Sequence, residues 1–217
     1  MNKKEQALLL ITAFEKAYPD AICSLNYQKP YELLIATRLS AQCTDARVNL
    51  VTPILFDRFQ TLEEIAAAEL SDIEEIIKPC GLYKTKARDI LAIAGQLLSR
   101  HGGIVPDSME ELLALSGVGR KTANLILGDV YHQPSVVCDT HCIRITNLLG
   151  LTSTKDPLKC ERELAALLPP EKSGDFCHRM VLHGRAVCRA RAPQCEGCCA
   201  NSPYLLCEYA QKHGQGS

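Results

Sequence analysis

Residues 115–123 read LSGVGRKTA, a glycine-containing stretch between two segments with helical periodicity. The upstream segment 106–115, PDSMEELLAL, places Ser108 and Glu111 at capping-box spacing and follows them with leucines. The downstream segment 121–130, KTANLILGDV, repeats apolar residues at helical intervals. A phosphate-binding P-loop would follow a strand and would have glycine before its lysine, where this chain has arginine. The stretch is therefore expected to join two helices.

Two glycines in this turn bear on what it could bind. Gly117 and Gly119 permit positive φ and leave the backbone uncovered, and Gly119 lies where the second helix begins. Amide groups at a helix start point outward and carry the positive end of the helix dipole. Such a helix-hairpin-helix turn can hold a DNA phosphate without reading a base. An ordinary helix corner with a glycine cap is the alternative.

Arg120 and Lys121 follow directly on the first turn of the second helix. The helix dipole and the adjacent arginine both disfavour a charged ammonium at this position. An amine that is neutral often enough can attack an electrophilic carbon, so Lys121 is a candidate nucleophile. The alternative is a lysine that grips phosphate as a simple cation.

A second polar group follows eighteen residues after Lys121. The segment 136–144, VVCDTHCIR, puts Asp139, Thr140 and His141 at the start of another expected helix. Asp139 fits the role of N-cap. It also fits a carboxylate that takes a proton or stabilises positive charge on a sugar. Lys121 and Asp139 would then be an amine nucleophile and its acid/base partner.

The rest of the chain predicts an all-α fold of about ten helices joined by short turns. Apolar residues recur at helical spacing in almost every segment, and alternating runs typical of strands are nearly absent. Beyond the two segments beside the turn, helical periodicity covers residues 7–14, 31–41, 44–58, 87–98, 138–149, 156–168 and 173–187.

Composition predicts a globular, soluble, intracellular protein. Hydrophobic residues make up 47% of the 217, no apolar run approaches the roughly 20 residues of a membrane span, and acids interrupt the N-terminal segment. The net charge of −1 does not by itself indicate a nucleic-acid partner. Residues 62–76 hold six acids and no Lys or Arg, whereas residues 176–191 hold four arginines, two histidines and no acid. That basic stretch can face phosphates or can be a solvated helix face.

Twelve cysteines are many for an intracellular chain. Seven are scattered, most of them among apolar neighbours, and are expected to be small buried hydrophobes. Five crowd into residues 188–207 in the order Cys188, Cys195, Cys198, Cys199 and Cys207. Four thiolates within such a segment can bind zinc or an iron–sulfur cluster. Cys188 has no near partner for a zinc hook, which modestly favours a cluster, and Cys199 leaves the third ligand ambiguous.

Taken together, these stretches resemble the endonuclease III family of DNA repair glycosylases. LSGVGRKTANLIL resembles the family's helix-hairpin-helix, VCDTH its catalytic aspartate loop, and HGRAVCRARAPQCEGC its iron–sulfur segment. LSAQCTDARVN (39–49) and GLYKTKA (81–87) resemble family segments that approach DNA. The similarity spans nearly the whole chain in the expected order, and the motifs in register are highly specific.

The resemblance implies a two-lobed all-α helix-hairpin-helix glycosylase fold with a C-terminal iron–sulfur loop. Residues 23–133 would form a six-helix bundle that contains the hairpin at about 108–131. Residues 1–22 and 134–217 would form the other lobe, with a four-iron four-sulfur cluster in the loop 188–207. DNA would lie across the cleft between the lobes.

The resemblance also implies an activity, a bifunctional DNA glycosylase and AP lyase of base excision repair. Lys121 would attack C1′ of a flipped, damaged nucleotide, form a Schiff base and cleave the strand by β-elimination, with Asp139 assisting. Oxidised pyrimidines follow as substrates from the family alone. Gln42 would fill the gap left by the flipped base and Leu82 would wedge into the stack. The DNA-contacting set is Gln42, Leu82, Gly117, Gly119, Arg120, His141, Arg185, Arg189 and Arg191.

One spacing departs from the family pattern. The family has five residues between its third and fourth cluster cysteines, whereas here eight separate Cys198 from Cys207 and seven separate Cys199 from Cys207. Taking Cys198 as the third ligand keeps the spacing C-x₆-C-x₂-C intact. The expected ligands are therefore Cys188, Cys195, Cys198 and Cys207, and the longer loop puts the local geometry in question.

Two alternative functions remain open. A monofunctional glycosylase for mispaired adenine belongs to the same family, but those relatives lack a lysine at the position of Lys121. A non-catalytic DNA-binding protein with a structural metal site would need neither Lys121 nor Asp139. The expected partner is double-stranded DNA with a damaged base or an abasic site. The protein is expected to be a monomer that does not bind a membrane. The expected compartment is the cytoplasm, or the nucleoid if the chain is bacterial.

Overall fold

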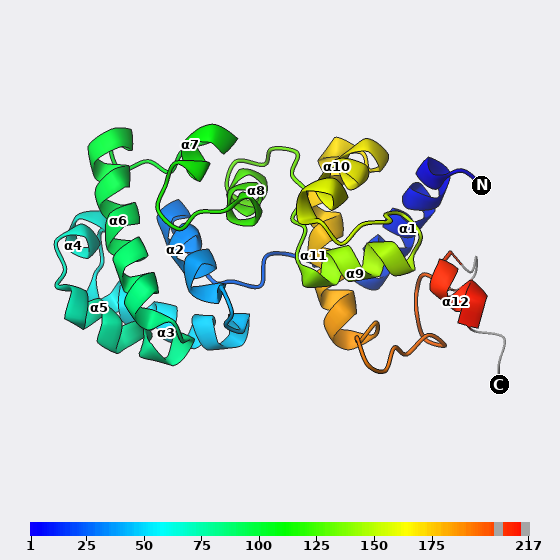
Figure 1. The fold of residues 1–217 in the computed structure, drawn as a ribbon, viewed down its shortest axis with the longest axis horizontal. Coiled ribbons are helices and arrows are strands. Elements are labelled where there is room, and N and C mark those ends of the chain that lie inside the picture. The colour runs from blue at the N-terminus through cyan, green and yellow to red at the C-terminus, as the bar shows by residue number, and fades with distance from the viewer. Residues whose placement is uncertain (202–205, 214–217) are drawn as a thin grey trace. The chain divides into compact units, whose positions relative to one another are not determined.

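The computed structural model describes residues 1–201 and 206–213, and within those ranges the chain is helical. Twelve α-helices and two short 3₁₀ helices occur there, with no strand among the described residues, so the all-α prediction is confirmed. The chain divides into two compact units (Figure 1). We call Cys23–Tyr131 the internal unit, and Met1–Ile22 together with His132–Ser217 the terminal unit. None of the described helices is long and apolar enough to cross a membrane.

The internal unit is built around one long helix, α6. Helices α2, α4 and α5 all pack against α6, which Figure 1 shows with α4 and α5 beside it. Apolar side chains from these helices form a closed core in which Leu33, Leu34, Ile73, Ile90 and Ile93 have no exposed surface. The helices of this unit are α2 (Pro30–Ser40), α3 (Asp45–Arg58), α4 (Leu62–Ala66), α5 (Leu70–Ile77), α6 (Tyr83–His101), α7 (Met109–Leu113) and α8 (Arg120–Asp129), with a 3₁₀ helix at Lys78–Cys80.

Two helices of the internal unit lie in the acid-rich segment 62–76, for which the sequence analysis predicted no helix. Thr61 caps the first of them, α4, by accepting a hydrogen bond from the backbone amide of Glu64. The five residues of α4 are too few to show a 3.6-residue period, whereas α5 does place Leu70, Ile73 and Ile77 at helical spacing, a signal that the sequence analysis missed. Their acids lie on the outer side, while Ile65 and Ile73 are fully buried.

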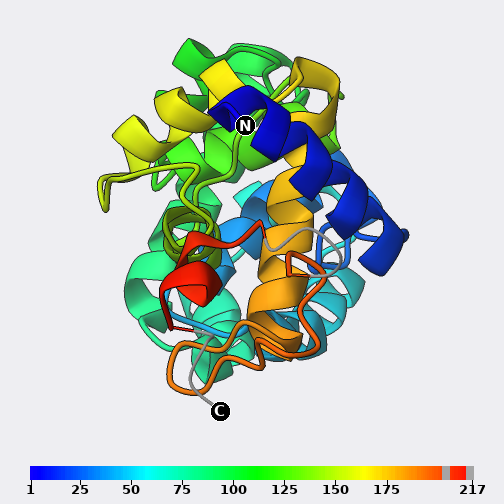
Figure 2. The ribbon, with the colours of Figure 1, turned by 90° about the vertical axis from the view of Figure 1, so that its right-hand side faces the viewer.

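The terminal unit brings both ends of the chain into one core. Helix α1 packs on α10 and α11, and α9 packs on α11. Figure 2 shows α1 running alongside α11. The ring of Phe14 meets those of Phe176 and His183 edge-on, with centroid distances of 6.0 and 4.9 Å. The helices of this unit are α1 (Lys3–Ala17), α9 (Thr140–Leu148), α10 (Pro157–Leu167), α11 (Ser173–Ala186) and α12 (Glu208–His213), with a 3₁₀ helix at Pro170–Lys172.

Candidate active site and cysteine centre

The turn between α7 and α8 has the expected local structure. Ser108 caps α7 by accepting a hydrogen bond from the amide of Glu111 at 3.3 Å. Gly117 has φ +67°, a left-handed conformation that strains a residue with Cβ, whereas Gly119 is extended and is the N-cap of α8. Only Gly117 therefore uses the positive φ that the sequence analysis allowed for both glycines. Of the leucines in 106–115, which were expected to form one apolar stripe, Leu112 and Leu115 are buried, whereas Leu113 is 41% exposed and does not belong to it.

An ion pair lies directly beneath Gly117. Arg38 on α2 contacts the Oδ2 atom of Asp89 on α6 through both Nε and a terminal guanidinium nitrogen, at 2.7 and 2.6 Å. A Cβ atom at Gly117 would lie 2.7 Å from Arg38 Nε and 2.9 Å from Asp89 Oδ2, closer than real Cβ contacts come. Glycine at 117 thus lets the hairpin turn rest on the pair that joins α2 to α6.

The start of α8 presents polar groups to solvent. Gly119, the N-cap residue, has no side chain to cap this helix, and such a helix start suits an anion. Arg120 and Lys121 are the first two residues of the helix, and both side chains are exposed. An exposed amine on a helix start, next to uncapped amides, can meet both a phosphate and a sugar carbon of the same strand.

Asp139 is the N-cap of α9, as predicted. Its Oδ1 atom accepts a hydrogen bond of 2.7 Å from the backbone amide of Cys142, and the side chain is half-buried. His141, two residues on, lies against α11, where a Cβ on Gly184 would come within 2.3 Å of its Nδ1 atom. Asp139 and His141 belong to the terminal unit, whereas Lys121 belongs to the internal unit.

Two other predicted DNA contacts have an unusual backbone. Gln42 and Leu82 adopt left-handed conformations, with φ of +56° and +48°, and His132 is the other described non-glycine residue that does so. A residue with a side chain loses about 1–2 kcal/mol in this region. Both side chains are exposed, Leu82 by 57%. Strain of this kind clusters at ligand-binding positions.

The predicted basic stretch 176–191 does not form one surface. Arg179 and His183 are buried, and Arg179 donates from Nε to the carbonyl of Tyr18 at 3.2 Å. The Nδ1 atom of His183 pairs with the hydroxyl of Tyr18 at 2.9 Å. These two side chains therefore stabilise the α1–α11 packing. The exposed part of the stretch is Arg185, Arg189 and Arg191.

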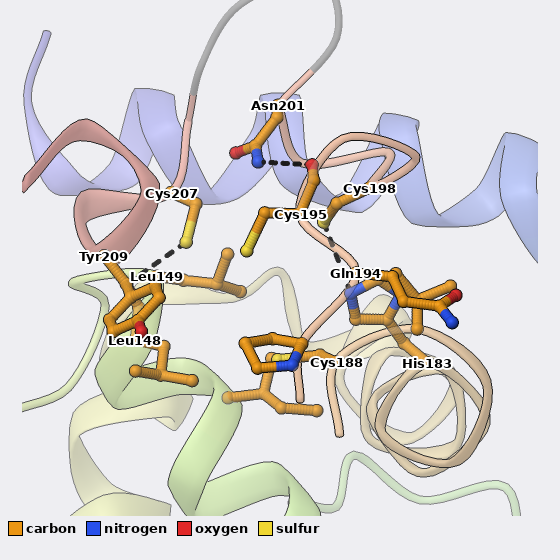
Figure 3. A pocket seen from close by; sticks show the side chains of 13 residues that line it. Leu148, Leu149, His183, Cys188, Gln194, Cys195, Cys198, Asn201, Cys207 and Tyr209 are labelled. Carbon is orange, nitrogen blue, oxygen red and sulfur yellow. Dashed lines mark hydrogen bonds between the residues drawn. The ribbon is translucent and has the colours of Figure 1, made fainter. Parts of the chain in front are cut away.

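Four of the five clustered cysteines line one pocket of the terminal unit (Figure 3). The cavity itself has a volume of only about 20 Å³, and the pocket opens to solvent. Cys188, Cys195, Cys198 and Cys207 contribute side chains from different sides of this pocket, whereas Cys199 is not among its lining residues. Apolar and polar neighbours complete the wall, among them Ile145, Leu148, Leu149, His183, Pro193 and Tyr209.

Hydrogen bonds hold the cysteine segments in place. Arg144 donates to the carbonyl of Cys188 at 2.6 Å and lies 3.4 Å from its sulfur. The sulfur of Cys198 lies 3.4 Å from His183 Nε2, and the sulfur of Cys207 donates to the carbonyl of Leu148 at 3.4 Å. Burial and the neighbouring Cys198 and Cys188 raise the pKa of the Cys195 thiol. Four thiolates here would repel one another unless a cation compensated them.

The cysteines do not converge on a point. Among the residues that the structure describes, no group of three or more His, Cys, Asp or Glu side chains could hold a single metal ion. A mononuclear zinc site needs its sulfurs about 2.3 Å from one centre. The pocket therefore presents four thiols on its walls without a position ready for one ion.

Comparison with known proteins identifies the family. Residues 35–170 match the family model described as HhH-GPD superfamily base excision DNA repair protein. A Synechocystis protein named Endonuclease III is 44% identical over 198 residues, which cover 91% of this chain and 90% of that protein. The Escherichia coli K12 protein of the same name is 37% identical over 212 residues, 98% of this chain and 99% of that protein.

A solved structure shares the whole fold. The structure described as a trapped Endonuclease III–DNA covalent intermediate in an estranged-adenine complex matches with a TM-score of 0.90 and 39% identity. The match covers 99% of this chain and 100% of that one. The chain belongs to the HhH-GPD superfamily of base excision DNA repair proteins and, within it, to the endonuclease III family of DNA glycosylases with AP lyase activity.

Proposed function

We propose that this chain removes oxidised pyrimidines from duplex DNA and cleaves the strand by β-elimination, with Lys121 as its nucleophile. The observation that carries this proposal is the exposed Lys121 amine on the first turn of α8, directly after the uncapped helix start at Gly119. A monofunctional adenine glycosylase needs no amine there, and a non-catalytic DNA-binding protein needs neither Lys121 nor Asp139.

In the proposed reaction, the amine of Lys121 bonds to C1′ of a flipped nucleotide as the bond to the damaged base breaks. Opening of the sugar ring gives a Schiff base. Loss of a 2′ proton then expels the 3′ phosphate and cleaves the strand, and water finally releases the amine. Asp139 supports deprotonation of the amine and the positive charge that develops on the sugar.

Several residues are proposed to hold the DNA during this reaction. The amides of Gly117 and Gly119 would bind a phosphate near the lesion, which the uncapped start of α8 supports. Gln42 would fill the gap in the duplex and Leu82 would part the stack, which their exposure and strained backbone support. The side chains proposed to contact the phosphate backbone are Arg120, His141, Arg185, Arg189 and Arg191.

We further propose that Cys188, Cys195, Cys198 and Cys207 hold a four-iron four-sulfur cluster. All four line one pocket without converging on a single ion position, and Cys199 lies outside the lining. A cluster of thiolate-bound iron suits that spread better than one zinc ion. When bound, the cluster would serve a structural role, ordering the loop that carries Arg189 and Arg191. The protein would act as a monomer, in the cytoplasm or on the nucleoid.

The test is borohydride trapping on two duplexes, one with a single thymine glycol and one with an abasic site. The expected result is a covalent protein–DNA adduct on both, absent in Lys121→Gln, while that variant still binds the abasic duplex. Lys159→Gln is the matched control, because Lys159 is also an exposed lysine on the first turn of a helix, α10.

The other outcomes identify other functions. An adduct on the abasic duplex alone would show a lyase with a different base substrate. Binding without any adduct would favour the monofunctional or the non-catalytic protein. Strand cleavage that persists in Lys121→Gln would overturn the assignment of the nucleophile.

A further inference from the structure

Lys86 is a lysine with no exposed surface, on the first half of α6 in the internal unit. Its Nζ atom donates hydrogen bonds to the carbonyl of Leu39 at 2.7 Å and to the carbonyl of Cys80 at 2.9 Å. Burial lowers the pKa of this ammonium. Burial of a cation is expensive unless polar partners compensate it, and these two hydrogen bonds provide that compensation. A buried apolar side chain would fill the same space without this cost, so the ammonium must have a role beyond packing.

The two carbonyls lie at the ends of two helical segments. Leu39 belongs to the last turn of α2, and Cys80 is the last residue of the 3₁₀ helix Lys78–Cys80. Carbonyls in a last turn have no partner within their own helix, and a cation is favoured at that end of the dipole. Lys86 therefore joins two helix ends that are 41 residues apart in the chain.

Each of these helix ends leads into one of the strained turns. Gln42 comes three residues after Leu39, and Leu82 comes two residues after Cys80. Both residues have positive φ and exposed side chains. A second contact lies at the same place, since burial and the neighbouring thiol of Cys43 raise the pKa of the Cys80 thiol to about 11. The two turns are thus held together from beneath by side chains of the internal unit.

We infer that Lys86 is a positioning residue for lesion recognition, which fixes the Gln42 and Leu82 turns at one separation so that both side chains enter the duplex together. This inference rests on the proposed function, where Gln42 and Leu82 are assigned to the gap and to the stack. Lys86 touches neither DNA nor the reacting atoms in this role. It acts through the backbone of the two turns.

A positioning role and a merely structural role differ in what they do to two substrates. A single-stranded abasic site offers no opposite base and no duplex gap, so it needs the amine of Lys121 but not the two turns. An abasic site in a duplex needs both. Loss of positioning therefore slows trapping on the duplex alone, whereas general loss of structure slows trapping on both substrates.

The experiment compares single-turnover borohydride trapping by wild type and Lys86→Met on abasic duplex and on abasic single strand. Methionine keeps the apolar stem and removes the hydrogen-bond donors. We expect trapping on the duplex to slow by about ten- to a hundredfold, as for a catalytic geometry displaced by an ångström, with trapping on the single strand unchanged. In a Gln42→Ala/Leu82→Ala background, Lys86→Met is expected to add no further loss, because the turns it positions no longer carry their side chains.

Ile93→Ala is the matched stability control, since Ile93 is also fully buried on α6. It is expected to lower the melting temperature without changing the ratio of duplex to single-strand trapping. If Lys86→Met does not fold, Lys86→Arg decides. Arginine keeps charged donors, but its larger, planar guanidinium donates to the two carbonyls from other positions than the ammonium does, so a smaller loss on the duplex alone is expected.

The remaining outcomes overturn the inference or point elsewhere. Equal loss on both substrates, no loss on either, or failure of both Lys86 variants to fold would make Lys86 a residue of the core and nothing more. If the wild type forms an adduct on neither substrate, the proposed function is contradicted. The wild type is therefore measured first, and the Lys86 variants are compared only if it forms an adduct.

Discussion

Asp139 has a structural role and a proposed chemical role, and one substitution separates them. Its side chain caps α9 through the amide of Cys142. Asparagine caps a helix as well as aspartate does but cannot take a proton. We expect Asp139→Asn to slow base release by about 10²–10⁴-fold, while stability falls only by the lost dipole interaction, about 0.3–1 kcal/mol. Single-turnover base release and thermal denaturation measure the two effects.

A second N-cap aspartate of the terminal unit provides the control for that prediction. Asp156 caps α10 by accepting a hydrogen bond from the amide of Lys159 at 2.8 Å. Asp156→Asn is expected to lose the same small amount of stability and none of the activity. If it slows base release as much as Asp139→Asn does, the effect belongs to capping, and the carboxylate assignment fails.

Gly117 provides a residue-scale prediction about the hairpin. Alanine there would strain a backbone at φ +67° and press its Cβ on Arg38 and Asp89. We expect Gly117→Ala to destabilise the protein by about 1–3 kcal/mol and to weaken DNA binding. Gly95→Ala is the opposite control, because a Cβ at Gly95, inside α6, would have nothing within 4 Å, and alanine favours helices by about 1 kcal/mol. Chemical denaturation of both variants checks the opposite signs, and equal stability of Gly117→Ala and wild type would contradict the steric argument.

At the residue scale, the sequence predicts the features that depend only on residues nearby in the chain. The helix start at Gly119 and the cap at Asp139 are confirmed because both follow from local backbone chemistry. The positive φ of Gln42 and Leu82 depends on contacts from distant segments, and so does the burial of Lys86. A pattern of residues along the chain carries no signal for these.

At the scale of elements, the cysteine loop is the least regular part of the terminal unit. Between residues 186 and 208 the described chain has no helix, so its shape depends on side-chain contacts and on any bound group. Adjacent thiols in this loop have different positions. Cys198 lines the pocket, whereas Cys199 does not, and the neighbouring Cys198 lowers the pKa of the Cys199 thiol.

That difference predicts the behaviour of two neighbouring substitutions. Protein purified without oxygen is expected to be yellow-brown, with an absorption band near ~400 nm from thiolate-bound iron. Cys198→Ser should lose this band and most of its iron, and Cys199→Ser should keep both. Iron analysis and absorbance per protein chain measure the result. The reverse pattern would make Cys199 the third ligand, and a colourless protein with stoichiometric zinc would overturn the cluster.

The sequence predicts the longer helices, and of the short ones it predicts only α7, whose capping-box spacing marks its start. Segments such as 44–58 and 173–187 show several periods, and α3 and α11 occupy them. Helices α4, α5 and α12 have between five and eight residues and form because a core lies beside them. The basic side chains of α11 illustrate a related limit. Charge along a helix does not say which of these side chains face solvent, and Arg179 and His183 turn inward.

At the scale of the molecule, the terminal unit depends on both ends of the chain. The side-chain amide of Gln6 on α1 donates to the carbonyls of Leu149 and Leu206, each at 2.8 Å. The N-terminal helix thus joins the segment after α9 to the segment just before Cys207. Since one of these contacts spans 200 residues, α1 holds the segment that leads into Cys207 only when the chain ends have come together.

The charge of the whole molecule leads to a prediction about DNA binding. With 24 Lys and Arg against 25 Asp and Glu, the net charge of −1 cannot attract a polyanion. Affinity for DNA must then come from local groups of exposed cations, of which Arg189 and Arg191 on the cysteine loop are two. Each phosphate contact changes the slope of log K against log salt by about 0.9.

We therefore expect the double variant Arg189→Ala/Arg191→Ala to bind an abasic-analogue duplex more weakly at low salt and with a salt slope smaller by about 1.8. Binding isotherms at several salt concentrations measure this slope. Lys155→Ala/Lys159→Ala, which removes the same charge elsewhere in the terminal unit, should leave the slope unchanged, and so separates phosphate contact from net charge. If both double variants lower the slope equally, DNA responds to the overall charge of the protein. If neither does, the cysteine loop does not touch the phosphate backbone, and its order serves the fold alone.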